Sequence, residues 1–163
     1  MQTLYLIGFM GSGKSTVGRL LHEKLGGSYH DTDQMVVEKY GEIAAIFEQK
    51  GENQFRDYET EMLKETASEN FVVSTGGGII ERKENGEFMK KNGLIIYLDT
   101  SFDEIGDRLG NDPVRPLWRK NDSEKQQLYK RRNKLYAGLA DITVTTDQKS
   151  PYIVVEEILG HLQ

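Results

Sequence analysis

Gly8-Phe9-Met10-Gly11-Ser12-Gly13-Lys14-Ser15 matches the phosphate-binding pattern G-x-x-x-x-G-K-[ST] without a gap. The apolar run 3–8 leads into it, and residues 14–25 follow it with apolar side chains at helical spacing. Glycines in such a loop let the backbone turn tightly and aim its N–H groups at phosphate oxygens, and the start of a helix adds a positive dipole end. The pattern therefore predicts a nucleotide-binding loop between a first strand and a first helix.

Two side chains of this loop are expected to carry its chemistry. Lys14 would reach the β- and γ-phosphates of ATP, and the hydroxyl group of Ser15 would ligate Mg²⁺. The residues that we expect to contact ATP are Gly11, Ser12, Gly13, Lys14, Ser15 and Thr16. The loop alone does not identify the reaction, because GTPase switches and ATPase motors use the same pattern.

The composition is that of one compact domain spanning residues 1–163. A net charge of −5 argues against a nucleic-acid binder, which normally needs a basic surface. No apolar run reaches the ~18–20 residues of a membrane span, and the N-terminus lacks the features of a signal peptide. Without cysteine the chain has no disulfide and no thiolate metal site. These features predict a cytoplasmic protein that holds its anionic ligands with a local cluster of Lys and Arg.

Short apolar runs alternate with helical patterns, which is typical of a doubly wound α/β fold with a parallel sheet. We expect strands at residues 3–8, 28–31, 71–74, 94–98 and 142–145. We expect helices at 14–25, 42–50 and 53–68, and further helices at about 102–109, 124–139 and from 151 onward. The last three follow N-terminal signals, namely the capping boxes Ser101 with Glu104 and Ser123 with Gln126, and Ser150 before Pro151.

Asp31-Thr32-Asp33 follows the second expected strand. Carboxylates two residues apart on an extended segment point the same way, so both could face the cleft. One would help to hold Mg²⁺ and the other would orient or deprotonate the attacking hydroxyl. For the metal, the best match to an apolar strand that ends in an acid is the run that ends in Asp99, but this is the fourth strand, and the third ends in Ser74. Asp31-Thr32-Asp33 is the second solution. The alternative is that the segment only caps a helix, with Asp33 as N-cap.

Arg56 and Glu59 are three residues apart, which on its own is typical of a surface ion pair on a helix.

Thr75-Gly76-Gly77-Gly78 is a more informative motif, because three glycines after a strand cost conformational entropy. They would serve a close backbone approach to a ligand or a run of positive-φ turns. A simple loop is the alternative.

Arg132 lies on the apolar stripe that Leu128, Leu135 and Leu139 form, whereas Arg131 lies off it. An inward-facing Arg is costly to bury without a partner, so Arg132 should meet a carboxylate or an anionic ligand. Alternatively, its side chain reaches the helix edge and stays solvated.

The segment 111–117 is polar, and Pro113 and Pro116 flank Val114 and Arg115. Prolines restrict a loop, which suits a lid that brings Arg115 onto phosphates and excludes water. A plain solvent-exposed loop is the alternative. Arg108 lies shortly before, at the end of a helix.

The full set of motifs, in this order, resembles the shikimate kinases over nearly the whole chain. The phosphate loop is common to many families, whereas the complete set is specific. The matching elements are 8–15, Asp31-Thr32-Asp33, Gly41 with Ile46-Phe47, Gly51-Glu52 with Phe55-Arg56 and Glu59, 75–78, Val114-Arg115-Pro116-Leu117, and Arg132 with Leu135-Tyr136.

The resemblance implies a five-stranded parallel sheet of order 2-3-1-4-5, a substrate-binding helical insertion at about residues 33–60 and a lid at about 110–123. It implies a monomeric, Mg²⁺-dependent enzyme that transfers the γ-phosphoryl group of ATP to the 3-hydroxyl group of shikimate, a step toward chorismate and the aromatic amino acids. A related gluconate kinase is the main alternative, because gluconate is also a carboxylated polyol. A GTPase-like switch is disfavoured, because the chain has no Asn-Lys-x-Asp guanine motif.

The same resemblance implies roles for individual residues. Asp33 would hold the shikimate hydroxyls and act as base, Arg56 and Arg132 would clamp the carboxylate, and the backbone of Gly76, Gly77 and Gly78 would contact the ring hydroxyls. Asp31 would join Ser15 at Mg²⁺. Arg115 would be the lid arginine, Arg108 would lie near the adenine, and residues 146–151 would line the base pocket.

Overall fold

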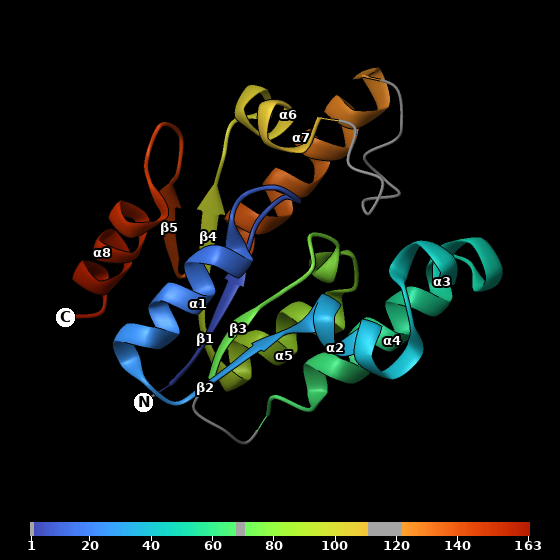
Figure 1. Cartoon of the computed structure of the whole chain (residues 1–163), viewed down its shortest axis with the longest axis horizontal. Helices are drawn as coiled ribbons and strands as arrows, with labels where there is room; N and C mark the ends of the chain where they lie inside the picture. The colour runs from blue at the N-terminus through green and yellow to red at the C-terminus, as the bar shows by residue number, and fades with distance from the viewer. Residues whose placement is uncertain (1, 68–70, 111–121) are drawn as a thin grey trace.

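The computed structural model of the chain describes residues 2–67, 71–110 and 122–163. Its sheet has the strand order β2-β3-β1-β4-β5, and every neighbouring pair is parallel, which confirms the expected fold (Figure 1). The strands are β1 (Thr3–Ile7), β2 (Ser28–Asp31), β3 (Phe71–Ser74), β4 (Gly93–Asp99) and β5 (Ile142–Thr145). Parallel strands need crossover connections, and helices supply these on both faces of the sheet.

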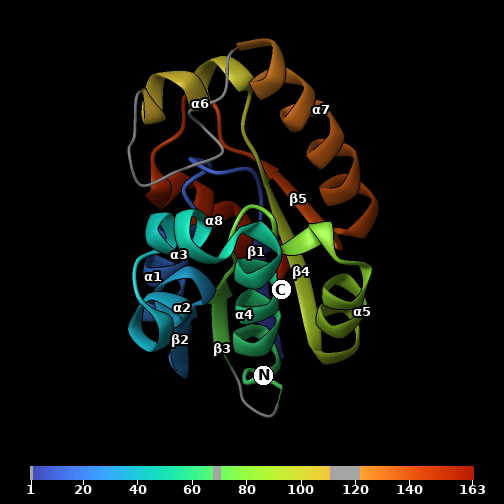
Figure 2. The same cartoon turned by 90° about the vertical axis from the view of Figure 1, so that its right-hand side faces the viewer.

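The alternation of side chains along β1 explains the two layers of helices. Leu4 and Leu6 face one way, toward α1 (Lys14–Leu25) and α8 (Pro151–His161). Tyr5 and Ile7 face the other way, toward α4 (Glu52–Lys64), α5 (Lys83–Asn92) and α7 (Asp122–Leu139). Figure 2 shows these last three helices on the near face of the sheet. Because both faces are covered, β1 is buried along its whole length.

Three helices are inserted between β2 and β3. These are α2 (Thr32–Tyr40), α3 (Ile43–Lys50) and α4, and they lie to one side of the sheet in Figure 1. They have a small hydrophobic core of their own, formed by Val36, Ile46, Phe55 and Met62. The insertion therefore carries its own packing, while α4 also reaches the main core through Leu63.

Two of the three expected N-terminal signals are confirmed. Ser101 caps α6 (Phe102–Leu109) by accepting a hydrogen bond from the backbone N–H of Glu104, and Ser150 caps α8 by accepting one from Ile153. The box expected at Ser123 is wrong, because α7 already begins at Asp122 and Ser123 lies in its first turn.

The cap of α2 is also different from the expectation. Asp31, not Asp33, is the N-cap, and its Oδ1 accepts a 3.2 Å hydrogen bond from the backbone N–H of Gln34. Asp33 lies in the first turn of the helix. The expectation that both carboxylates lie on one extended segment is therefore wrong, because the chain becomes helical at Thr32.

Three elements were not among those expected, namely α2, which appeared only in the alternative for Asp31-Thr32-Asp33, α5, and the short 3₁₀ helix η1 (Ile79–Glu81). The segment that forms α5 is mostly polar and contains Gly86. That glycine lets α7 approach, since a Cβ on Gly86 would lie 3.1 Å from Cδ1 of Leu139. Met89 of α5 is buried in the core that covers β4, so packing against the sheet, and not local periodicity, stabilises α5.

Within the described residues, no helix combines the length and the apolar character that a membrane crossing requires.

Candidate active site

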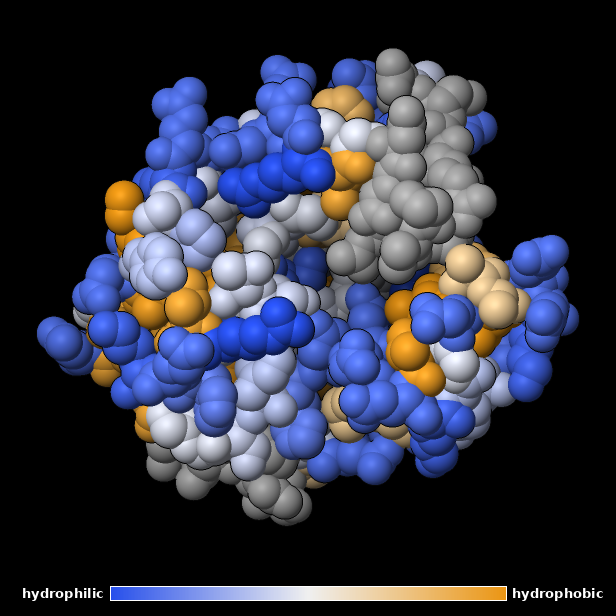
Figure 3. Space-filling view, viewed as in Figure 1, coloured by the Kyte–Doolittle hydropathy of each residue, from blue (hydrophilic) through white to orange (hydrophobic). Residues whose placement is uncertain are grey.

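The carboxyl ends of β1, β2 and β3 bring the sequence motifs to one edge of the sheet, where ligands bind in open parallel sheets. A cavity of about 260 Å³ opens there. The residues around it include Lys14, Ser15, Asp31, Asp33, Gly77 and Arg108. Figure 3 shows a hollow on this face with mostly hydrophilic residues around it.

The phosphate loop has the backbone shape that its glycines predict. Gly11 has φ +83° and Gly13 has φ +95°, both in the left-handed region that a side chain disfavours. The buried ammonium group of Lys14 donates to the carbonyl oxygens of Gly8 (2.6 Å) and Phe9 (3.1 Å). Because α1 begins at Lys14, its positive dipole end faces the same cavity.

Ser15 and Asp31 meet beside the loop. Oγ of Ser15 donates to Oδ2 of Asp31 over 2.6 Å, so a hydroxyl and a carboxylate oxygen adjoin Lys14. Ser74 has a structural contact instead, because its Oγ donates to the backbone oxygen of Lys14 over 2.8 Å. Asp99 accepts a hydrogen bond from Tyr97 and is not among the described residues around the cavity.

The triple glycine allows charged side chains to lie directly against the backbone. A Cβ on Gly76 would lie 2.5 Å from Oδ1 of Asp33 and 2.7 Å from Oε2 of Glu59. A Cβ on Gly78 would overlap the guanidinium group of Arg56. None of these glycines has a positive φ, so the expected run of positive-φ turns is wrong. Close approach is the reason for the glycines, and the neighbours are the protein's own ionic groups.

Arg56 and Glu59 form a buried ion pair, so the surface-pair alternative is wrong. Nη1 of Arg56 donates to Oε1 of Glu59 over 2.9 Å, and Nη2 lies 3.3 Å from Oε2 of Glu52. Burial raises the pKa of Glu59 to about 7; Arg56 and Arg132 oppose this rise, and the charge of Asp33 adds to it. From the sequence, Glu59 was expected only as the ion-pair partner of Arg56 and not as a residue of the site. The three-residue spacing of the pair was the signal that could have indicated it.

Arg132 faces inward, as expected, and is 1% exposed. Its Nε donates to Oε2 of Glu81 over 3.1 Å, which the sequence did not suggest. Leu135 was expected on the same face but is 42% exposed. Tyr136 is buried in its place and donates its hydroxyl hydrogen to the carbonyl of Gly77. Arg132 and Tyr136 are four residues apart and therefore lie on the same, buried face of α7.

A second cavity, of about 410 Å³, lies on the other side of the phosphate loop. Thr146, Lys149 and Pro151 line it together with Gly13 and Arg108. Nη1 of Arg108 donates to the carbonyl of Gly11 over 3.0 Å, which ties the end of α6 to the loop. Arg115 and most of the lid expected at about residues 110–123, namely residues 111–121, lie outside the described residues.

The parallel sheet has a phosphate loop after its first strand, and ionic side chains face that loop, which defines a P-loop nucleotide-binding protein. The family model described as shikimate kinase matches residues 10–163. The chain is 48% identical to the shikimate kinase of Persephonella marina, over 100% of both sequences. The protein therefore belongs to the shikimate kinase family.

Solved structures agree with this assignment. The shikimate kinase of Acinetobacter baumannii in complex with shikimate superposes with a TM-score of 0.95 and 37% identity, covering 99% of this chain and 93% of that one. A gluconokinase from Sinorhizobium meliloti has a TM-score of 0.65 and 18% identity, over 99% of this chain and 91% of that one. The likeness to the gluconokinase shows a shared fold only.

Proposed function

We propose that this protein transfers the γ-phosphoryl group of ATP to the 3-hydroxyl group of shikimate, giving 3-phosphoshikimate and ADP. The observation that carries the proposal is that Lys14 and Asp33 line one cavity at the triple glycine, with the buried Arg56 and Arg132 next to that loop. A phosphate-binding group, a hydroxyl-binding group and two carboxylate-binding groups thus lie together. The relative in complex with shikimate supports the choice of acceptor.

The ATP side of the site uses the phosphate loop. The backbone of Gly11, Ser12 and Gly13 would bind phosphate oxygens, with Lys14, Ser15 and Thr16 at the start of α1. The adenine would occupy the 410 Å³ cavity between Arg108 and the segment 146–151. Arg115 remains predicted to reach the phosphates from the lid.

The metal site is proposed at Ser15 and Asp31. A hydroxyl and a carboxylate, 2.6 Å apart beside the phosphate loop, are hard oxygen donors of the kind that Mg²⁺ binds, with water and phosphate oxygens as the remaining ligands. The residues present therefore fit the ion. When bound, Mg²⁺ neutralises charge on the β- and γ-phosphates.

The acceptor side needs groups that recognise hydroxyls and a carboxylate. We assign the hydroxyls to Asp33 and to the backbone of Gly76, Gly77 and Gly78. We assign the carboxylate to Arg56 and Arg132. Nε of Arg56 and Nη2 of Arg132 are buried without a hydrogen-bond partner among the described residues. Leaving buried donors unpaired costs free energy, which a bound carboxylate would recover.

In the reaction, the protein mainly positions its substrates and neutralises charge. Asp33 orients the acceptor hydroxyl and accepts its proton, while Lys14 stabilises the oxygens of the transferred phosphoryl group. Holding both substrates at one edge of the sheet replaces an encounter in solution by a fixed geometry. We further infer that the protein works as a monomer in the cytoplasm, with the insertion at about residues 33–60 as the acceptor-binding part of one domain.

The proposal is tested by ADP release from Mg²⁺·ATP with shikimate, gluconate, AMP or no acceptor. We expect ADP release to depend on shikimate alone. Release with gluconate or AMP would reassign the acceptor and leave the nucleotide site intact. Equal release without any acceptor would contradict kinase activity.

A further inference from the structure

Glu81 connects two consecutive arginines of α7, of which one is exposed and the other is buried. Its carboxylate accepts two hydrogen bonds from Arg131, from Nη1 to Oε1 (2.5 Å) and from Nη2 to Oε2 (2.6 Å). The same Oε2 also accepts the 3.1 Å hydrogen bond from Nε of Arg132. One carboxylate therefore holds both guanidinium groups, which belong to a helix 50 residues further along the chain.

The three side chains differ strongly in exposure. The side chain of Arg132 is 1% exposed, that of Glu81 is 17% exposed and that of Arg131 is 56% exposed. Glu81 thus lies at the boundary between the site and solvent. Burial by itself raises the pKa of Glu81, but the hydrogen bond from Arg131 and the charges of both arginines outweigh it and lower the pKa. The carboxylate is therefore ionised near neutral pH.

The contact with Glu81 determines which edge of Arg132 is available. Nε is engaged by Glu81, whereas Nη2 is buried without a hydrogen-bond partner among the described residues. Nη1 lies 3.5 Å from the position that a Cβ would take on Gly77. The outer edge of the guanidinium group therefore faces the triple-glycine loop, and this edge suits a planar carboxylate.

We propose that Glu81 is a positioning residue that sets the orientation of Arg132 for the acceptor carboxylate, and that Arg131 secures Glu81 from the solvent side. This inference rests on the proposed function and adds two residues to it, one of them exposed. A guanidinium group fixed in its binding geometry loses less conformational entropy when the substrate binds. Glu81 and Arg131 therefore act on shikimate affinity without touching shikimate.

The backbone around Glu81 is held independently of the arginines. The N–H of Glu81 donates to the carbonyl of Gly78 over 3.0 Å, and Nδ2 of Asn85 donates to the carbonyl of Ile79 over 2.9 Å. Removing the charge of Glu81 should thus leave η1 in place. This makes Glu81→Gln a suitable test, because the variant keeps the size of the side chain.

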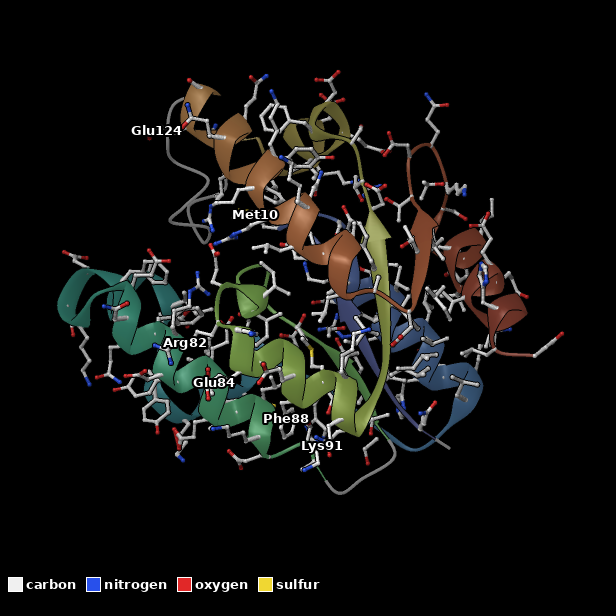
Figure 4. The ribbon with its side chains drawn as sticks, turned by 180° about the vertical axis from the view of Figure 1, so that it is seen from behind. Met10, Arg82, Glu84, Phe88, Lys91 and Glu124 are labelled. Carbon is white, nitrogen blue, oxygen red and sulfur yellow. The ribbon has the colours of Figure 1, made fainter. Side chains whose placement is uncertain are left out.

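The experiment measures kcat and the KM values for shikimate and ATP in Glu81→Gln, Arg131→Ala and Arg131→Lys. We expect Glu81→Gln to raise the KM for shikimate about tenfold, the order expected when a hydrogen bond to a charged group is lost. Arg131→Ala should raise it less, and Arg131→Lys should restore part of the loss. The KM for ATP and kcat should stay within about twofold. Glu84→Gln is the matched control, because Glu84 pairs with exposed Lys64 on the outside of α5 and should change none of these values (Figure 4).

A second readout separates positioning from general stability. The carboxamide analogue of shikimate lacks the negative charge that Arg132 is proposed to bind. Glu81→Gln should therefore lower the ratio of kcat/KM for shikimate to kcat/KM for the carboxamide. An equal loss for both acceptors, or an equal rise in the KM values for shikimate and ATP, would overturn the proposal.

The variant Arg132→Ala shows whether a negative result contradicts the role of Glu81 alone or the proposed function on which it rests. If Arg132→Ala raises the KM for shikimate and Glu81→Gln does not, the positioning role of Glu81 is wrong and the proposed function stands. If Arg132→Ala itself leaves the KM for shikimate unchanged, the assignment of the carboxylate to Arg132 is wrong, and the role of Glu81 fails with it.

Discussion

Asp33 and Glu59 each place a carboxylate oxygen over the backbone of Gly76, where a Cβ would lie 2.5 Å from the first and 2.7 Å from the second. The two acids come from different helices, α2 and α4. Burial is the main factor that disfavours ionisation of Glu59, and the nearby charge of Asp33 adds to it. Glu59 is fully buried, and its pKa is raised to about 7.

The raised pKa of Glu59 predicts a pH-dependent stability. The folded state keeps this proton up to a pH of about 7, whereas the unfolded chain loses it near 4.5. Protons bound only in the folded state make stability fall as pH rises. We therefore expect the wild type to lose on the order of 3 kcal/mol between these two values from this group.

Urea unfolding at several pH values checks this prediction against Glu59→Gln. At low pH the variant should be about as stable as the wild type, because protonated Glu59 is as neutral as the glutamine that replaces it. The decisive quantity is the slope of the unfolding free energy between pH 5 and about 7, which should be flatter in the variant. Equal slopes in the two proteins would show that Glu59 does not titrate in this range.

Asp33→Asn tests the proposed base. The amide keeps the size of the side chain but cannot accept a proton, so turnover should fall by about 10²–10⁴-fold. The affinity for ATP, measured by calorimetry, should stay nearly unchanged because Asp33 lies on the acceptor side. Near-normal turnover would remove Asp33 from the role of base.

Gly76→Ala tests the close approach at the triple glycine. The added Cβ would displace the carboxylates of Asp33 and Glu59, at a cost of about 1–3 kcal/mol in stability, and we expect a large rise in the KM for shikimate. Gly160→Ala is the control, because Gly160 lies in α8 and a Cβ there would meet nothing within 4 Å. If both variants behave alike in unfolding and in kinetics, the crowding at Gly76 has no functional role.

Asp31→Asn tests the proposed metal site. Removing the carboxylate charge next to Ser15 should raise the Mg²⁺ concentration needed for half-maximal rate by about tenfold, while saturating Mg²⁺ restores much of kcat. Titration of the rate with MgCl₂ at fixed ATP measures this shift. An unchanged Mg²⁺ requirement would place the second protein ligand elsewhere.

Much of the fold could be predicted from local patterns. The expected bounds of the helix 14–25 and of the strands 28–31, 71–74 and 142–145 coincide with the structure. Apolar periodicity predicts an element because it indicates which face of the segment becomes buried, and glycine-rich turns indicate where the element ends. The helix α5 escaped prediction because it has few apolar residues, and its buried apolar side chain, Met89, packs into a core built by distant segments.

Several of the residues that the sequence singled out lie close together in the structure, but the contacts among them were not predicted. The sequence marked Arg56, Arg132 and the triple glycine, and it suggested Glu59 as a surface partner of Arg56, yet it left the partner of Arg132 open. The ion pair of Arg56 with Glu59 is short-range in sequence, but its burial depends on the triple-glycine loop lying against it. Local spacing cannot reveal burial of this kind, because it arises from segments that are distant in the chain.

The sequence by itself determined the phosphate loop, the α/β class and the identity of most charged groups in the cleft. These depend on residue type and on spacings within a few residues, where the backbone geometry of a turn or a helix is already set. Only the tertiary structure decided which carboxylate meets which arginine. The hydrogen bond from Arg132 to Glu81 joins residues 51 positions apart, and it exists because α7 packs over η1. Contacts of this range depend on the packing of the whole sheet and its helices, which no local pattern encodes.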